Sequence, residues 1–201
     1  MADDSSTEKL RLFIAIPIPE PVRDEIIRIQ LELQPLVPRA AARWTRPDQF
    51  HLTLRFLGDV PFAGLEKLKE SVNAVCLSAR LLQLRAEGVG FFPNPHSPRV
   101  VWVGIDDQAG LLVELQKRIE TAISSFTAEP GEKNFSGHAT LGRLKNLKPP
   151  DARKLAAHAQ TFKDRTFGEW TAHEVELIGS ELSSTGPRHT TLAAFRLGAK
   201  D

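Results

Sequence analysis

Compact apolar runs alternate along the chain with segments in which apolar side chains recur every three to four residues. The second spacing is that of one buried helix face, whereas a short apolar run bounded by Gly or Pro is typical of a buried strand. The helical spacing predicts four helices, at residues 21–33, 65–75, 112–126 and 151–162. The apolar runs predict strands at residues 10–18, 44–57, 82–89, 100–105, 138–144, 171–178 and 189–197.

Strands outnumber helices, and strand–helix–strand elements recur in each half of the chain. This order predicts an α+β fold of two similar lobes that flank a groove. No linker rich in Pro, Ser or Gly separates the halves, so we expect residues 1–201 to form one bilobal domain with a flexible tail at 1–9. Asp151 follows two prolines and is expected to cap the fourth helix.

Composition changes this picture little: 41% of the residues are hydrophobic, 25% are charged, and the formal net charge is +1. A near-neutral chain gives no global signal for nucleic acid. Residues 39–55, however, contain four arginines and one acid, which fits either a solvated loop or a phosphate-facing rim. The single cysteine, Cys76, excludes an intrachain disulfide and is expected in the core.

No apolar run approaches the roughly 18 residues that a membrane-spanning helix needs. The first nine residues are polar and acidic, unlike a signal peptide. We therefore expect a cytoplasmic protein without membrane contact.

The pattern His-x-Thr-Leu occurs twice, beginning at His51 and at His138, each time in a predicted strand. Side chains two apart on a strand share a face, so each copy presents an imidazole and a hydroxyl side by side. Strict alternation places Arg55 on the face of His51 and Thr53. The opposite face is then apolar, made of Phe50, Leu52, Leu54 and Phe56.

Two such faces brought together supply two imidazoles and two hydroxyls around one small anion. Hydrolysis of a phosphodiester needs a base for water and an acid for the departing oxygen, and imidazole titrates near neutral pH. The hydroxyls of Thr53 and Thr140 can donate to the non-bridging oxygens. Arg143 can bind phosphate as a fork of donors, but it reaches the face of His138 only if the strand bulges, for which Gly142 is suitable.

A third match begins at His189, but its strand lacks a strongly apolar back face, so we expect a partly exposed strand residue. The remaining histidines are expected to be incidental. Phe13, Phe92 and Trp102 can stack a terminal base, although core packing is the expected fate of most of them.

Zinc is an alternative for the two histidines, but a catalytic zinc site usually has three protein ligands. No His-x-His, His-x-x-x-His or cysteine pair supplies the others, and neither a Gly-x-Ser-x-Gly elbow nor a nucleotide-binding Gly-rich loop is present. We expect neither a metal nor another cofactor.

At these residues the chain resembles the two-histidine (2H) phosphoesterase superfamily, specifically the bacterial and archaeal RNA 2′,3′-cyclic phosphodiesterases once named 2′-5′ RNA ligases. The resemblance covers nearly the whole chain. It is carried by the segments 11–16, 51–58, 88–93, 98–104, 135–143 and 180–182, together with Trp44 and Gly186.

The resemblance implies two pseudo-symmetric lobes of antiparallel sheet with helices outside and the active-site cleft between them. It implies metal-independent opening of a 2′,3′-cyclic phosphate at an RNA 3′ end to a 2′-phosphate. His51 would donate the proton to the 3′ oxygen, and His138 would activate water. Thr53, Thr140 and Arg143 would hold the phosphate. We also expect a monomer with no obligatory protein partner.

The chain departs from the family pattern at two places. Gly137 precedes the second histidine where proline is usual, which we expect to loosen the start of that strand. Tyrosine is common near the position of His189, and this chain has no tyrosine.

Two rival functions fit the same residues. One is a related phosphoesterase that acts on a small cyclic phosphate or a 2′-5′ linkage, including the reverse ligation of RNA. The other is an RNA-end binding module without catalysis, which would not require two groups that titrate near pH 7.

Overall fold

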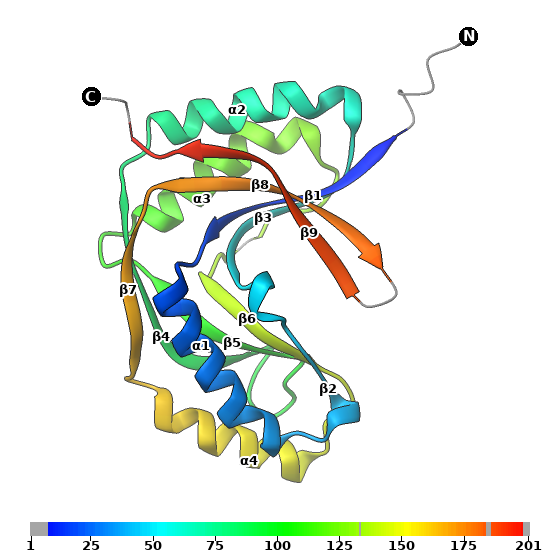
Figure 1. Ribbon diagram of the computed structural model, residues 1–201, viewed down its shortest axis with the longest axis vertical. Coiled ribbons are helices and arrows are strands. Elements are labelled where there is room, and N and C mark those ends of the chain that lie inside the picture. Colours follow the sequence, from blue (N-terminus) through cyan, green and yellow to red (C-terminus); the bar gives the residue numbers. More distant parts are fainter. Residues whose placement is uncertain (1–7, 133, 184–185, 199–201) are drawn as a thin grey trace.

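The computed structural model describes residues 8–132, 134–183 and 186–198. Its strands form two antiparallel sheets, one in the upper and one in the lower lobe of Figure 1. The upper sheet has the order β3 (His51–Pro61), β1 (Lys9–Pro17), β8 (Glu174–Ser183), β9 (Gly186–Arg196). The lower sheet has the order β2 (Ala42–Trp44), β6 (His138–Leu144), β5 (Val100–Asp106), β4 (Leu82–Phe92), β7 (Thr166–Ala172).

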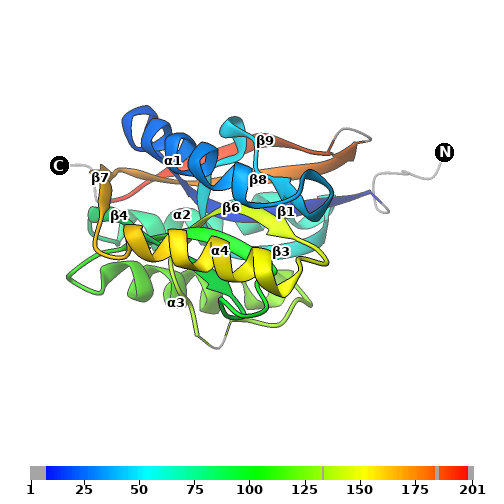
Figure 2. The ribbon, with the colours of Figure 1, turned by 90° about the horizontal axis from the view of Figure 1, so that it is seen from below.

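Two helices cover each sheet, so the α+β, two-lobe prediction is confirmed (Figures 1 and 2). The upper sheet carries α2 (Leu65–Leu77) and α3 (Leu111–Ile123), and the lower sheet carries α1 (Glu20–Leu33) and α4 (Pro149–Ala159). Helical periodicity gives each helix one apolar face, which becomes buried. On α1 this face consists of Val22, Ile26, Ile29 and Leu33, all buried as the spacing predicts.

Each sheet combines strands from both halves of the chain. The order β3-β1-β8 in the upper sheet corresponds to β6-β5-β4 in the lower one, so β4 and β8 each complete the sheet begun by the other half. One continuous set of buried apolar side chains runs through both lobes. This exchange places β3 and β6, the strands that begin with the two His-x-Thr copies, next to each other across the cleft.

Two predicted strands are wrong, because each is divided between the sheets. The run 44–57 contains the end of β2, a 3₁₀ turn at Pro47–Gln49 and then β3. Pro47 has no N–H for a ladder, and the chain crosses from the lower to the upper lobe there. The run 171–178 is divided at His173 between β7 and β8, where no Gly or Pro marks the crossing.

Two further expectations need correction. Asp151 does not cap α4: the cap is Lys148, and the helix begins at Pro149, where the missing N–H costs no hydrogen bond. Of the tail expected at 1–9, residues 1–7 lie outside the described residues, and Lys9 already pairs in β1.

Candidate active site

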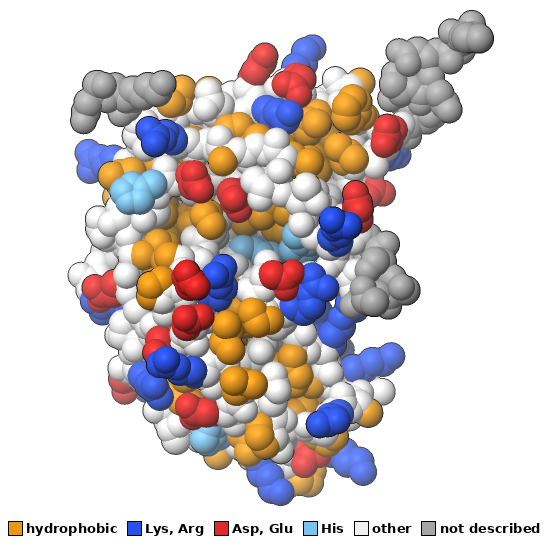
Figure 3. All heavy atoms as spheres, in the orientation of Figure 1, with side chains coloured by type: hydrophobic (Ala, Val, Ile, Leu, Met, Phe, Trp, Pro, Cys, Tyr) orange, Lys and Arg blue, Asp and Glu red, His pale blue; other side chains and the backbone are white. Residues whose placement is uncertain are grey.

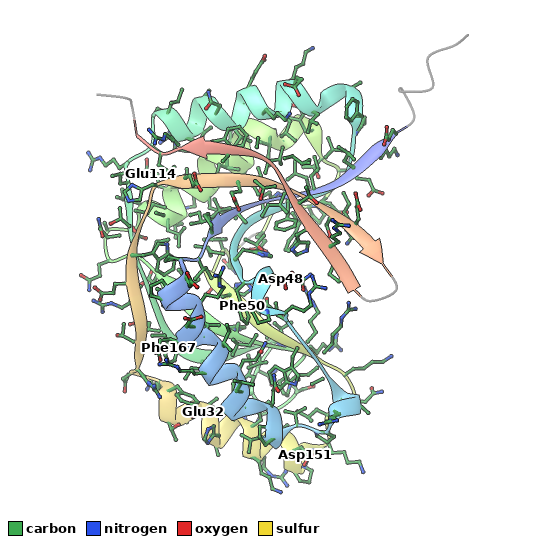
Figure 4. All side chains as sticks on the ribbon, in the orientation of Figure 1. Glu32, Asp48, Phe50, Glu114, Asp151 and Phe167 are labelled. Atoms are coloured by element: carbon green, nitrogen blue, oxygen red, sulfur yellow. The ribbon has the colours of Figure 1, made fainter. Side chains whose placement is uncertain are left out.

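Four of the five predicted site residues line one cavity of about 350 Å³ between the lobes: His51 and Thr53 from β3, Thr140 and Arg143 from β6. The space-filling view shows histidine side chains at the bottom of a hollow in this region (Figure 3). Asp48 and Phe50, just ahead of His51, also lie between the lobes (Figure 4). The threonines of the two motifs, Thr53 and Thr140, are 87 positions apart in the chain but line the same cavity.

The fifth residue, His138, lies beside this cavity, close enough for its charge to act on His51. Its ring packs against Phe92, with ring centroids 5.0 Å apart, and against Trp102, with centroids 6.1 Å apart. Its Nδ1 lies 2.8 Å from the carbonyl oxygen of Ser136, so Nδ1–H donates there and Nε2 is the ring nitrogen available to accept a proton. His51 makes the same kind of bond to the backbone of Gln49, also two residues earlier.

A bulge in β6 places Arg143 in the cavity. In the pairing with β5, Trp102 faces Thr140 and Val101 faces Gly142, so Leu141 is the extra residue. Beyond a bulge the alternation of faces shifts by one residue, and Arg143 emerges on the side of Thr140. The expected irregularity is present, one residue before the glycine proposed for it.

Gln30, a buried polar residue of α1, holds this bulge. Its Nε2 donates to the carbonyl oxygens of Leu141 and Thr45, each at 2.8 Å. The backbone N–H of Thr45 donates to Leu141 as well, at 2.9 Å. The carbonyl at the bulge therefore has two donors. Sequence reasoning missed Gln30, since a glutamine among apolar helix positions resembles any surface residue.

A corresponding bulge in β3 makes the predicted alternation wrong beyond Thr53. Ala15 pairs with Thr53 and Ile14 with Arg55, so Leu54 is the extra residue. Arg55 turns inward and is only 4% exposed, whereas Phe56 turns into the cavity and is 49% exposed. The Arg55 guanidinium lies against Glu120 at 2.7 Å and donates to the backbone of Glu129 and Pro130. It ties β3 to the segment that leads towards β6.

The two bulges lie at equivalent positions, so Phe56 and Arg143, again 87 residues apart, occupy matching places in the two lobes. Both lobes contribute a His and a Thr at matching positions. At the position after the bulge they differ, because β3 contributes the phenyl ring of Phe56 and β6 the guanidinium of Arg143. A bound anion is attracted to the β6 side.

The family model described as LigT like Phosphoesterase matches residues 16–102 and, a second time, residues 103–189. The two matches are offset by the same 87 residues as the two motifs. The chain belongs to this family.

Named relatives of this LigT-like phosphoesterase cover almost its full length. A protein of Methanothermobacter thermautotrophicus named RNA 2′,3′-cyclic phosphodiesterase is 31% identical over 94% of this chain and 100% of its own. One of the same name from Methanocaldococcus jannaschii is 33% identical over 89% of this chain and 95% of its own.

Among solved structures, TT0787 of Thermus thermophilus is similar, with a TM-score of 0.77 and 28% identity over 96% of this chain and 100% of that one. Escherichia coli LigT, in a complex with 3′-AMP, has a TM-score of 0.74 at 23% identity, over 94% of this chain and 99% of its own. The second likeness supports the fold.

Within the LigT-like site, His51 has a strongly altered proton affinity. Burial and then the charge of His189, with a smaller effect from His138, lower its pKa from 6.5 to about 4. The bond to the Gln49 backbone opposes this shift. In the free protein at neutral pH, His51 is therefore uncharged.

Besides Phe56, two ring-bearing residues that were not predicted in the site line this cavity: His189 and Phe13. His189 is partly buried in β9, as expected for a strand residue, but it lines the cavity. Phe13 is buried, as expected for a core residue, yet its ring lies 4.8 Å from His51 and 5.0 Å from His189, between centroids. Two sequence signals pointed to His189: the third His-x-Thr match and the tyrosine that is common near this position in the family.

Gly137 does not loosen the start of β6. A Cβ atom there would lie 2.3 Å from the carbonyl oxygen of Ile105, so glycine is what lets the two backbones approach. The Gly137 carbonyl accepts the Ile105 N–H at 2.9 Å.

In the parts of the chain that the structure describes, no three His, Cys, Asp or Glu side chains gather as a metal site would require. No helix in these parts is both long and apolar enough to cross a membrane.

Proposed function

We propose that this protein hydrolyses the 2′,3′-cyclic phosphate at an RNA 3′ end to a 2′-phosphate, with His51 and His138 as acid and base. The observation that carries the proposal is the shared cavity: two His-x-Thr faces from different sheets meet there, and a bulge adds Arg143. Full-length relatives named RNA 2′,3′-cyclic phosphodiesterase support the substrate.

The chemistry follows from where the groups lie. His138 Nε2 takes a proton from water, and the water oxygen forms a bond to phosphorus. The bond from phosphorus to the 3′ oxygen breaks, and His51 gives that oxygen a proton, so the phosphate stays on the 2′ oxygen. The hydroxyls of Thr53 and Thr140 and the fork of Arg143 donate to the non-bridging oxygens as their charge grows.

If His51 is the acid, it must be protonated when substrate is bound. With a pKa of about 4 the free protein holds it neutral. A phosphodiester anion bound beside it favours the charged form and raises its pKa. Substrate binding and proton uptake by His51 are therefore coupled in this proposal.

The wider setting belongs to the same proposal. Each sheet contains strands from both halves of the chain, so residues 1–201 are proposed to act as one unit and as a monomer, without an obligatory protein partner. The expected place of action is the cytoplasm, where RNA ends occur.

The test is incubation with a short RNA that ends in a 2′,3′-cyclic phosphate, in EDTA, followed by identification of the new end. We expect a 2′-phosphate from the wild type and none from His51→Ala or His138→Ala, with all three proteins folded by circular dichroism. A 3′-phosphate product would contradict the proposed regiochemistry, and a requirement for added metal would contradict the two-histidine mechanism. RNA that binds tightly but is never changed would favour the binding module.

A further inference from the structure

Three rings from three strands pack together on the β3 side of the cleft. Phe13 of β1 contacts both His51 of β3 and His189 of β9, and the two imidazoles contact each other edge to face with centroids 5.5 Å apart. The reactive ring of His51 is thus held between a buried phenyl ring and a second imidazole. The proposed mechanism uses neither Phe13 nor His189.

The position of His189 is itself secured by the turn that precedes His51. The side chain of Gln49 donates to the carbonyl oxygen of Pro187, two residues before His189 on β9. The backbone of Gln49 bonds the His51 ring. Gln49 therefore holds β9, and with it His189, in a fixed position relative to the His51 imidazole.

Besides the imidazoles, the cavity is lined by three charged side chains, Arg11, Glu129 and Arg143. Asp48 and Arg46 act on His189, and they are paired with each other through hydrogen bonds of 2.7 and 3.0 Å. His189 and His138 act on His51. Because the Arg46–Asp48 pair nearly cancels its own charge, the cation that His51 meets on the β9 side is protonated His189. Burial lowers the pKa of His189, so this charge is present only at acidic pH.

We propose that His189 is a positioning residue for His51: its ring fixes the orientation of the imidazole against Phe13, and a proton on His189 disfavours a second proton on His51 until an anion enters the cleft. Two cations at this separation repel, so the pair resists taking up a second proton. A substrate phosphate supplies the negative charge that relieves this repulsion. The consequence for turnover rests on the proposed function, whereas the coupling of the two imidazoles does not.

Two substitutions separate the two effects. His189→Phe keeps a ring against Phe13 and His51 but removes the charge, and His189→Ala removes both. His173→Phe is the matched control, since His173 is exposed between β7 and β8. All three variants should give a wild-type circular dichroism spectrum and a cooperative unfolding transition.

The first readout is the titration of His51 by NMR, without substrate and again with inorganic phosphate. The His51 resonance is assigned by its loss in His51→Gln. Two unit charges at this separation in a watery cleft change a pKa by about half a unit or more, so His189→Phe should raise the pKa of His51 by that amount. His173→Phe should leave it unchanged. An unaltered pKa of His51 in His189→Phe would overturn the electrostatic part of the proposal.

The second readout is kinetic, with RNA that ends in a cyclic phosphate. In the kcat/KM profile of the free enzyme, the inflection that reports His51 should move to higher pH in His189→Phe. His189→Ala should also lower kcat by about tenfold relative to His189→Phe, because the His51 ring loses its orientation. Equal kcat values for the two variants would overturn the positioning part.

The two readouts also distinguish this inference from the proposed function. If the wild type shows no turnover, the proposed substrate is wrong, but the NMR titration still decides whether His189 controls His51. If the wild type is active, His189→Phe matches it in titration and pH profile, and His189→Ala matches His189→Phe in kcat, the inference fails and the proposed function stands.

Discussion

The imidazole of His51 lies where burial and two neighbouring imidazoles all disfavour its charged form. In the unfolded chain the same group titrates near 6.5, whereas in the folded protein its pKa is about 4. Between these values the unfolded chain binds more protons than the folded one. Stability is therefore fully present above pH 6.5 and falls as the pH is lowered towards 4.

We predict that His51→Gln, which cannot titrate, flattens this dependence. The wild type should lose at most about 3 kcal/mol through His51 across the window, and the variant should not. The measurement is the free energy of unfolding in urea at several pH values between 4 and 7. Some slope will remain, because burial also lowers the pKa of His189. His173→Gln is the control, and parallel curves for wild type and His51→Gln would contradict the altered pKa.

Arg143 occupies the position that Phe56 occupies in the other lobe. Its planar guanidinium can donate two hydrogen bonds to phosphate, which a lysine ammonium cannot do in the same fixed geometry. We predict that Arg143→Ala lowers kcat/KM by roughly a hundredfold, through weaker binding and weaker stabilisation of the transition state. Arg143→Lys should recover only part of this loss. Steady-state kinetics on the cyclic-phosphate RNA checks both, and an unaffected kcat/KM in Arg143→Ala would remove Arg143 from the site.

Among the elements, the bulge of β6 depends on a helix residue that never touches the cavity. Gln30→Leu removes the donor shared by Leu141 and Thr45, so we predict a loss of about 1–3 kcal/mol in the free energy of unfolding. The bulge can then relax, which would turn Arg143 away and raise KM more than it lowers kcat.

The chain offers a matched control for this change. Gln116 is also a buried helix glutamine, but its Nε2 has no partner among the residues that the structure describes. Gln116→Leu should therefore be neutral or stabilising. If both substitutions cost the same stability, the loss at Gln30 would reflect packing and not the bonds to the bulge.

The sequence predicts most elements, because helical spacing and apolar runs report burial directly. It predicts the pairing of His with Thr, since residues two apart must share a strand face. It fails at Arg55 and Phe56, because a bulge exchanges their faces and no glycine marks Leu54. It also fails where the chain crosses between lobes at Pro47 and His173, since only a few residues separate the strands of the two sheets at each place.

For the whole molecule, the exchange of strands ties the lobes together. Without residues 1–96 the lower sheet lacks β2 and β4, and β4 lies between β5 and β7. Without residues 97–201 the upper sheet lacks β8 and β9. Each half alone would therefore have an incomplete sheet with unpaired strand edges, and its helices would lack the sheet surface against which they pack.

We predict that the fragments 1–96 and 97–201, divided in the connection between β4 and β5, show no cooperative thermal transition by circular dichroism when made separately. The intact chain should show one transition, common to both lobes. A cooperative transition in either isolated fragment would contradict the proposal of a single unit.

The central claim is that His51 and His138, from different lobes, act on one phosphate as a unit. The most direct test is the single-turnover rate on RNA with a 2′,3′-cyclic phosphate for His51→Ala, His138→Ala and the double variant. We predict that each single change costs about 10³-fold or more and that the double variant is no slower than the slower single one. Near-wild-type turnover in either single variant, or losses that multiply in the double variant, would contradict the claim.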